Sequence, residues 1–230
     1  SIDWGDTSKI VYLYTREYGN INVIAKGARK LKSTYTGNLE PLNLLETIIY
    51  FSPKRELQIL GQISLENSFQ KLKLNLDKTA CALSILELIQ TFIHYSEKDQ
   101  IFFDFVNSIL NDMQLADKPR LILWYFMLKL ASYLGFKPEF QICKNCKKKI
   151  NQNNILFRIN EGTVICNDCN LSDENQKLLS KNVLKFLYSL QNTHYKKVIN
   201  ISYPEDHKFN FTEFIISLVM VFWKKSMKTR

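Results

Sequence analysis

Short apolar runs separated by turn residues fill the first third of the chain. The runs at 10–14, 21–25, 44–51 and 57–63 are rich in β-branched and aromatic residues, a pattern typical of strands. Gly19-Asn20 and the SPKR segment at 52–55 supply turn chemistry between them. Four or more strands joined by tight turns in about 65 residues predict a small closed β-barrel.

From about Leu76 the apolar residues recur at helical spacing, first over 82–93 and then over 101–110. Residues 121–134 are apolar nearly all round, which predicts a helix buried on most faces and ended by Gly135 and Pro138. Two further helices are expected at about 174–190 and 211–225.

These patterns predict an α+β protein with two domains. A barrel covers residues 1–75, and a mainly helical domain covers 76–230, with an insert at about 141–172 that carries paired cysteines.

The charge of the chain is strongly positive and unevenly distributed. Lys and Arg number 31 against 22 Asp and Glu, which gives a net charge of +9. Segments 1–76, 77–140, 141–170 and 171–230 carry +3, −2, +3 and +5. An excess of this size attracts polyanions, either nucleic acid or an anionic membrane surface.

No secretory or membrane segment is visible in the sequence. The most apolar stretch, 214–223, is ten residues long, whereas a spanning helix needs about 20. The opening residues lack a basic segment followed by an apolar run, so a cytoplasmic protein is expected. The chain starts at Ser1 and not at Met, as expected of a processed product or of a sequence that lacks its first residues.

Four of the five cysteines form two CxxC pairs, with nineteen residues between them: Cys143, Cys146, Cys166 and Cys169. Two intervening residues let a tight turn direct both thiols at one ion, and two such turns complete the tetrahedral site that Zn²⁺ prefers. Because the protein fills all four positions, the predicted role of the single zinc ion is structural and not catalytic.

The alternatives for these cysteines are two disulfides or a redox pair. Disulfides require an oxidising compartment, for which there is no signal peptide. A redox CxxC would accompany a thioredoxin-like βαβ unit, which the pattern does not contain. Cys81, alone at the start of an apolar helix, is expected in the core.

A cluster of cations directly follows the second predicted strand, with Lys26, Arg29, Lys30 and Lys32 in the sequence KGARKLK. If this segment stays extended, the three lysines share one face with Ala28 between them, and neighbours two apart on that face lie about 6.6 Å from each other. Such a row can follow a phosphate backbone. Nearby tyrosines, including Tyr14 and Tyr18, could stack on bases. The alternative is a solvated hairpin edge, where lysines prevent aggregation.

Candidate catalytic groups are scarce. The three histidines are scattered without a neighbouring nucleophile, and no Gly-rich phosphate loop is present. An enzyme is therefore the least favoured class of protein.

Several segments together resemble the bacterial RecO recombination-mediator family. They are IVYLYTREYG at 10–19, VIAKGARK at 23–30, the Lys32-Ser33 and LEPL pieces up to residue 42, LASYLGFKP at 130–138, and the two cysteine pairs. The resemblance covers nearly the whole chain, although the family's short strand before Ile2 is expected to be missing.

The resemblance implies an N-terminal OB-fold and a helical domain with a zinc knuckle. It also implies a DNA-repair and recombination mediator that is not an enzyme. Such a protein binds single- and double-stranded DNA, anneals complementary strands and, with RecR, assists loading of RecA onto DNA coated by single-stranded-DNA-binding protein. The helical domain would contact the acidic C-terminal tail of that coating protein, with the basic, apolar C-terminal part as the expected surface.

On this hypothesis Arg16, Lys26, Arg29, Lys30 and Lys32 neutralise phosphates, Tyr14 or Tyr18 stacks on bases, and the protein works in the bacterial cytoplasm at the nucleoid. The rival hypothesis is a protein-interaction scaffold of the repair machinery, whose basic surface docks an acidic protein tail and not DNA.

Overall fold

The computed structural model describes residues 1–93, 98–169, 176–202, 204 and 209–228, without the side chains of 222 and 225–228. The chain divides into two compact units, Ser1–Pro119 and Arg120–Arg230, and each is described by itself. The predicted α+β class is confirmed.

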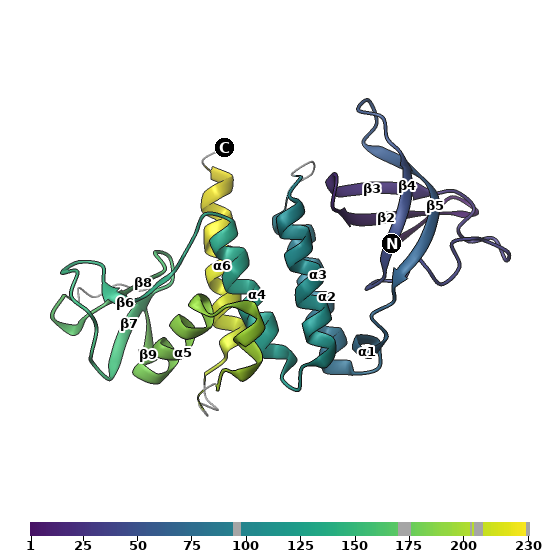
Figure 1. The fold of residues 1–230 in the computed structure, drawn as a ribbon. Helices are drawn as coiled ribbons and strands as arrows, with labels where there is room; N and C mark the ends of the chain where they lie inside the picture. Colours follow the sequence, from purple (N-terminus) through teal and green to yellow (C-terminus); the bar gives the residue numbers. More distant parts are fainter. Residues whose placement is uncertain (94–97, 170–175, 203, 205–208, 229–230) are drawn as a thin grey trace. The chain divides into compact units, whose positions relative to one another are not determined.

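A five-stranded sheet in the order β1-β2-β3-β5-β4 forms the first part of unit one (Figure 1). Its strands are β1 (Ile2–Trp4), β2 (Ser8–Thr15), β3 (Gly19–Ala25), β4 (Leu44–Tyr50) and β5 (Leu57–Asn67). β3 pairs with β5 in parallel, and the other neighbours are antiparallel. This order is that of the Greek-key OB-fold.

The four predicted strands are confirmed, but three details differ. Ile2–Trp4 forms a strand that the pattern did not indicate. The turn between β2 and β3 lies at 16–18, and Gly19, at a φ of 65°, already pairs with Thr15. Among the described residues, pairing runs from β1 to β4 without a β4–β1 ladder, so the barrel is partly open, not closed.

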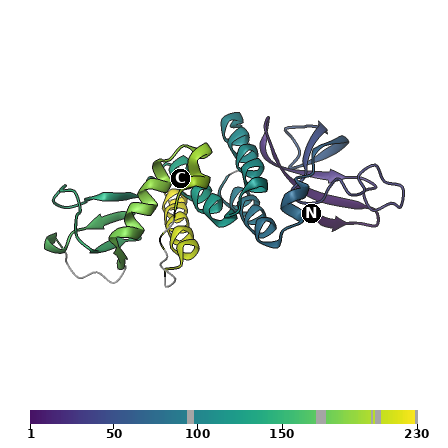
Figure 2. The ribbon, with the colours of Figure 1, turned by 60° about the horizontal axis from the view of Figure 1, so that its bottom comes forward.

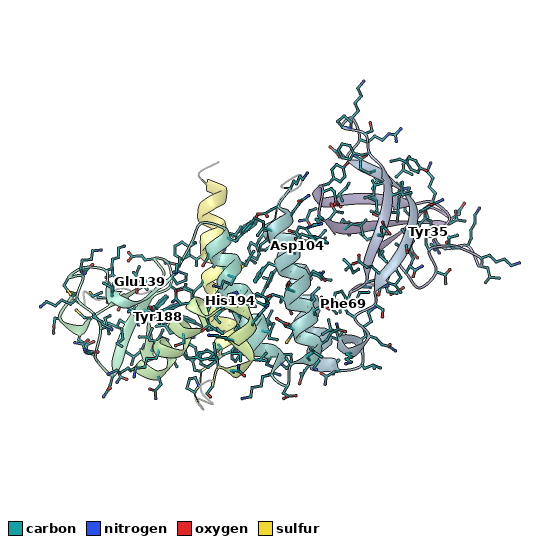
Figure 3. The ribbon with its side chains drawn as sticks, in the orientation of Figure 1. Tyr35, Phe69, Asp104, Glu139, Tyr188 and His194 are labelled. Carbon is teal, nitrogen blue, oxygen red and sulfur yellow. The ribbon has the colours of Figure 1, made fainter. Side chains whose placement is uncertain are left out.

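Alternation along the strands builds the barrel core. Every second residue of β3, namely Ile21, Val23 and Ala25, is buried, and these pack with Val11 and Leu60. Tyr35, in the connection between β3 and β4, ties that connection to β5 (Figure 3). Its hydroxyl lies 2.9 Å from the Leu60 carbonyl oxygen and 2.6 Å from that of Gly61.

Three helices complete unit one: α1 (Gln70–Lys73), α2 (Leu76–Phe92) and α3 (Gln100–Leu115). Asn75 and Asp99 cap α2 and α3, because their side chains accept hydrogen bonds from backbone N–H groups of the first turn. Phe69, almost completely buried, precedes α1 with a left-handed φ of 44°. The sequence predicted α2 and α3 but not the single turn of α1.

The described residues of unit two form three helices, a four-stranded sheet in the order β6-β8-β7-β9, and two short 3₁₀ helices (Figure 2). The helices are α4 (Pro119–Tyr133), α5 (Lys181–Asn192) and α6 (Phe211–Lys228). The strands are β6 (Glu139–Cys143), β7 (Asn154–Arg158), β8 (Thr163–Ile165) and β9 (Gln176–Ser180), and the 3₁₀ helices are η1 (Asn167–Cys169) and η2 (Tyr195–Asn200).

Aromatic contacts join the helices of unit two. The ring of Trp124 lies 6.2 Å from that of Phe186 and 4.9 Å from that of Phe211, so α4, α5 and the start of α6 share one core. Phe157 of β7 contacts Phe214 of α6 at 5.2 Å, which attaches the sheet to the same core.

The helix expected at about 174–190 is wrong in its first part. Residues 174 and 175 lie outside the described residues, and Gln176–Ser180 is a strand that pairs antiparallel with β7. Ser180 then caps α5 by accepting a hydrogen bond from the N–H of Val183. Pairing along β7 satisfies the backbone of 176–180, and this outweighs its helical spacing.

Unit one ends at Pro119, so the first three helices belong to the same compact unit as the barrel. The predicted boundary at residue 75 lies between α1, which ends at Lys73, and α2, which begins at Leu76.

Gly61 of β5 tests the packing of the barrel. A Cβ at this position would lie 2.8 Å from the Tyr50 ring and 2.9 Å from the Ile48 carbonyl oxygen. Since a backbone atom is involved, we expect Gly61→Ala to lower the free energy of unfolding by about 1–3 kcal/mol in urea denaturation. Ser64→Ala, at an exposed position of the same strand, is the control and should change it by less than about 0.5 kcal/mol. Equal stability of the two variants would contradict this packing.

Candidate functional site

The four paired cysteines converge on one point of unit two. Cys143 ends β6, Cys166 follows β8, and Cys146 and Cys169 each lie three residues further along. Their ligand atoms lie within 4.8 Å of one another, and the Sγ atoms of Cys146 and Cys166 are 3.7 Å apart. Four thiolates at about 2.3 Å from a tetrahedral ion would be separated by about 3.8 Å. The geometry therefore fits a metal ion.

Tight turns in the backbone direct the thiols inward. The N–H of Lys147 donates to the Cys143 carbonyl at 3.0 Å, and Lys147 adopts a left-handed φ of 62°. The N–H of Cys169 donates to the Cys166 carbonyl, also at 3.0 Å. Across the cluster, the N–H of Cys166 points at the Cys143 sulfur at 3.4 Å.

The thiols influence one another's ionisation. Burial acts to raise the pKa of Cys143, but the N–H groups of Cys166, Cys146 and Asn145 outweigh it and lower this pKa to about 6. Hydrogen bonding with the Cys166 thiol, followed by burial, raises the pKa of Cys169 to about 12. Backbone N–H groups thus stabilise the thiolate form of Cys143. Several thiolates this close together repel one another unless a cation lies between them, as in a metal site.

The seven candidate DNA-binding residues do not form one site, because they lie at two ends of the β2–β3 hairpin. Lys9 pairs with Ala25 at one end, and Thr15 pairs with Gly19 at the other. Six residue steps separate these pairs, a distance of about 20 Å. The basic segment 26–32 leaves the first end, and the 16–18 turn forms the second (Figure 1).

The expectation that Lys26, Lys30 and Lys32 share a face of an extended chain is wrong. β3 ends at Ala25, and residues 26–29 and 31–32 are in turns. Hydrogen bonds from the N–H of Lys30 to Gly27 and from that of Ser33 to Lys30 coil this segment. Gly27 permits the first turn because its φ is 76°.

The cations of the basic segment differ in their environment. All three lysines are exposed. Arg29 is exposed as well, but its guanidinium lies 3.1 Å from the Gly5 carbonyl oxygen and 3.4 Å from the Asp3 carboxylate. We infer that Arg29 holds the segment against β1, while the lysines are oriented to solvent.

At the hairpin turn, all three candidates contact other side chains of unit one. Arg16 forms an ion pair with Asp104 of α3 at 2.9 Å. The ring of Tyr14 packs against those of Phe102 and Phe103, at 6.4 and 5.6 Å. The ring of Tyr18 stacks on that of Phe51, with centroids 4.8 Å apart and planes 15° from parallel.

Comparison with known proteins agrees with both halves of the structure. Residues 1–69 match the family model "Recombination protein O N terminal", and residues 73–215 match "Recombination protein O C terminal". A relative named DNA repair protein RecO from Caldanaerobacter subterraneus is 32% identical over 200 residues, covering 86% of this chain and 79% of the relative. One of the same name from Desulforamulus reducens is 24% identical over 229 residues, covering 100% and 88%.

The chain belongs to the RecO family. This membership supports a role in DNA repair and recombination, and it confirms the resemblance found in the sequence. In the part of this RecO-family chain that the structure describes, no helix has the length and hydropathy needed to cross a bilayer.

Sequence reasoning missed Phe51 as a partner of Tyr18, because 33 positions separate them. The parallel pairing of β3 with β5, with Asn22 opposite Leu57, brings the 51–56 connection to the 16–18 turn. The sequence offered one signal for this contact: Phe51 is a large apolar residue at the end of a predicted strand, directly before the turn at 52–55.

The cluster predicts one bound zinc per chain, because four thiolates in tetrahedral reach favour Zn²⁺. We expect elemental analysis of purified protein to find one ion, and Cys146→Ser to reduce the content to near zero. Cys81→Ser is the matched control, since Cys81 lies in α2 of unit one.

Removal of the ion by a chelator should lower the melting temperature, because metal binding contributes folding free energy. A chelated chain with an unchanged melting temperature would contradict a structural role.

Proposed function

We propose that this RecO-family chain is a DNA-repair and recombination mediator that acts without covalent catalysis. It binds single- and double-stranded DNA, anneals complementary strands and, with RecR, assists loading of RecA onto DNA coated by single-stranded-DNA-binding protein. It works in the bacterial cytoplasm at the nucleoid. Family membership and the exposed lysines of segment 26–32 support this proposal.

The basic segment would contact phosphates through charge. Lys26, Lys30 and Lys32 are exposed at one end of the barrel, and their neighbour Arg29 is fastened to β1. Such cations release counterions from nucleic acid on binding, whatever its sequence. Arg16 would contribute only if it left Asp104.

Annealing follows from the same charge. Two complementary strands repel each other as polyanions, and a cationic surface lowers that repulsion as they approach. This step forms base pairs only, so no nucleophile or general base is required.

The metal would be Zn²⁺, held by Cys143, Cys146, Cys166 and Cys169. All four ligands come from the protein, so the ion would fasten β6 to β8 and supply no catalytic position. Its effect on DNA binding would be indirect, through the stability of unit two.

Binding of the acidic tail of the coating protein is assigned to the basic C-terminal part. α6 runs through Lys224, which is exposed, but the side chains of 225–228 lie outside the described residues. This assignment rests on the family alone.

The double variant Lys30→Ala/Lys32→Ala tests the binding of phosphates by the basic segment. We expect the plot of log K against log salt to become shallower by about 1.4 for single strands and by about 1.8 for duplex, because each phosphate that is no longer neutralised reduces the slope by about 0.7 and 0.9 respectively. Fluorescence anisotropy over a salt series measures both slopes.

Lys185→Ala/Lys197→Ala removes the same charge from exposed positions of unit two and should leave the slopes unchanged. Equal effects of the two double variants would show that net charge matters and not the basic segment. Binding of an acidic peptide, without any binding of DNA, would favour the scaffold function.

A further inference from the structure

An exposed aromatic stack lies at the hairpin-turn end of the barrel, opposite to the basic segment. The rings of Tyr18 and Phe51 are nearly parallel at 4.8 Å, yet the residues remain 41% and 49% exposed. The barrel core proper, built on Val11, Val23 and Leu60, is closed to solvent without them. The pair therefore presents aromatic surface to solvent that the barrel core does not need.

Both turns that carry the rings are braced by dedicated hydrogen bonds. The Thr15 hydroxyl accepts from the N–H of Tyr18 and donates to the Gly19 carbonyl, both at 3.0 Å. Gln58, only 3% exposed, accepts from the N–H of Ser52 at 2.7 Å and donates to the carbonyls of Ser52 and Arg55. The rings are therefore held in place before any ligand arrives, which reduces the entropy lost on binding.

The charges around the stack are nearly balanced. The two turns carry Arg16, Lys54 and Arg55 against Glu17 and Glu56, and Arg16 is paired with Asp104. A ligand at this end must therefore gain most of its binding free energy from the rings, and little from the release of counterions.

We propose that Tyr18 and Phe51 form a stacking platform for the unpaired bases of single-stranded DNA, with Lys54 and Arg55 beside it for the adjoining phosphates. This deepens the proposed function and rests on it: the basic segment 26–32 takes phosphates of either strand form, and the platform selects single strands. Bases in a duplex are already stacked and do not offer their faces to the rings.

The distance between the basic segment and the aromatic stack allows one DNA strand to contact both. About 20 Å of hairpin separates them. A single strand held at both ends would lie along the barrel, with its bases fixed at one end and its backbone at the other. OB-folds cover about 4–16 nucleotides of single strand, which is long enough to span that distance.

Phe51→Ala in the zinc-loaded chain of residues 1–230 tests the platform. The probes are an oligothymidylate of about 16 nucleotides and a duplex of the same length. We expect roughly tenfold weaker binding of the single strand, the same reduction at about 50 mM and at about 200 mM salt, and duplex binding within about twofold. Anisotropy titrations measure all of these values.

Conservative variants of Phe51 distinguish stacking on an aromatic ring from contact with an apolar side chain of similar size. Phe51→Trp keeps a ring and should retain affinity, with the emission of the new indole quenched by oligothymidylate. Phe51→Leu keeps an apolar side chain without a π-face and should behave like Phe51→Ala. Tyr188→Ala removes an exposed ring from α5 of unit two and should have no effect (Figure 3). Melting temperatures establish that every variant is folded.

The outcomes separate this proposal from the function on which it rests. If Phe51→Ala binds both probes normally while Lys30→Ala/Lys32→Ala flattens the salt slope, the platform is wrong and the proposed function stands. Equally weakened binding of single strand and duplex, or full affinity in Phe51→Leu, also overturns stacking. If the parent protein binds neither probe, both proposals fail.

Discussion

The register of the β2–β3 hairpin is the constraint on which the rest of the barrel depends. Pairing of Lys9 with Ala25 and of Thr15 with Gly19 places the basic segment and the hairpin turn at opposite ends. A shift by one residue would turn Ile21, Val23 and Ala25 out of the core, so burial fixes this register strongly. Charge and exposed aromatic surface are consequently separated along one rigid element, and the two proposed kinds of DNA contact follow from that separation.

The cysteine end of the unit-two sheet follows a different principle, because local turns bring four thiols together beside a small apolar cluster. At this end of the sheet a small closed cluster consists of Cys143, Ile165 and Cys166, with the other paired cysteines packed against it. An ion at this point would crosslink two turns that are otherwise joined through short strands. On the other side, Phe157 joins the sheet to the aromatic core of the helices.

Features determined by local sequence could be predicted, and features determined by distant pairing could not. Alternation located β2 to β5, and CxxC spacing located the cluster, because each depends on neighbours in the chain. Gln176–Ser180 was expected to be helical, since nothing local reveals that β7 lies beside it. The coil of 26–32 depends on Gly27, which has a positive φ and lies two residues after the end of β3. The contact of Tyr18 with Phe51 required the parallel β3–β5 pairing.

Annealing of two complementary oligonucleotides by the zinc-loaded chain, followed by fluorescence, tests the central claim most directly. The reaction is compared at two salt concentrations, on bare strands and on strands coated with single-stranded-DNA-binding protein. The account predicts acceleration that weakens as salt rises and that persists on the coated strands. The claim would be contradicted if the folded, zinc-loaded protein did not accelerate annealing. It would also be contradicted if the acceleration did not change with salt concentration.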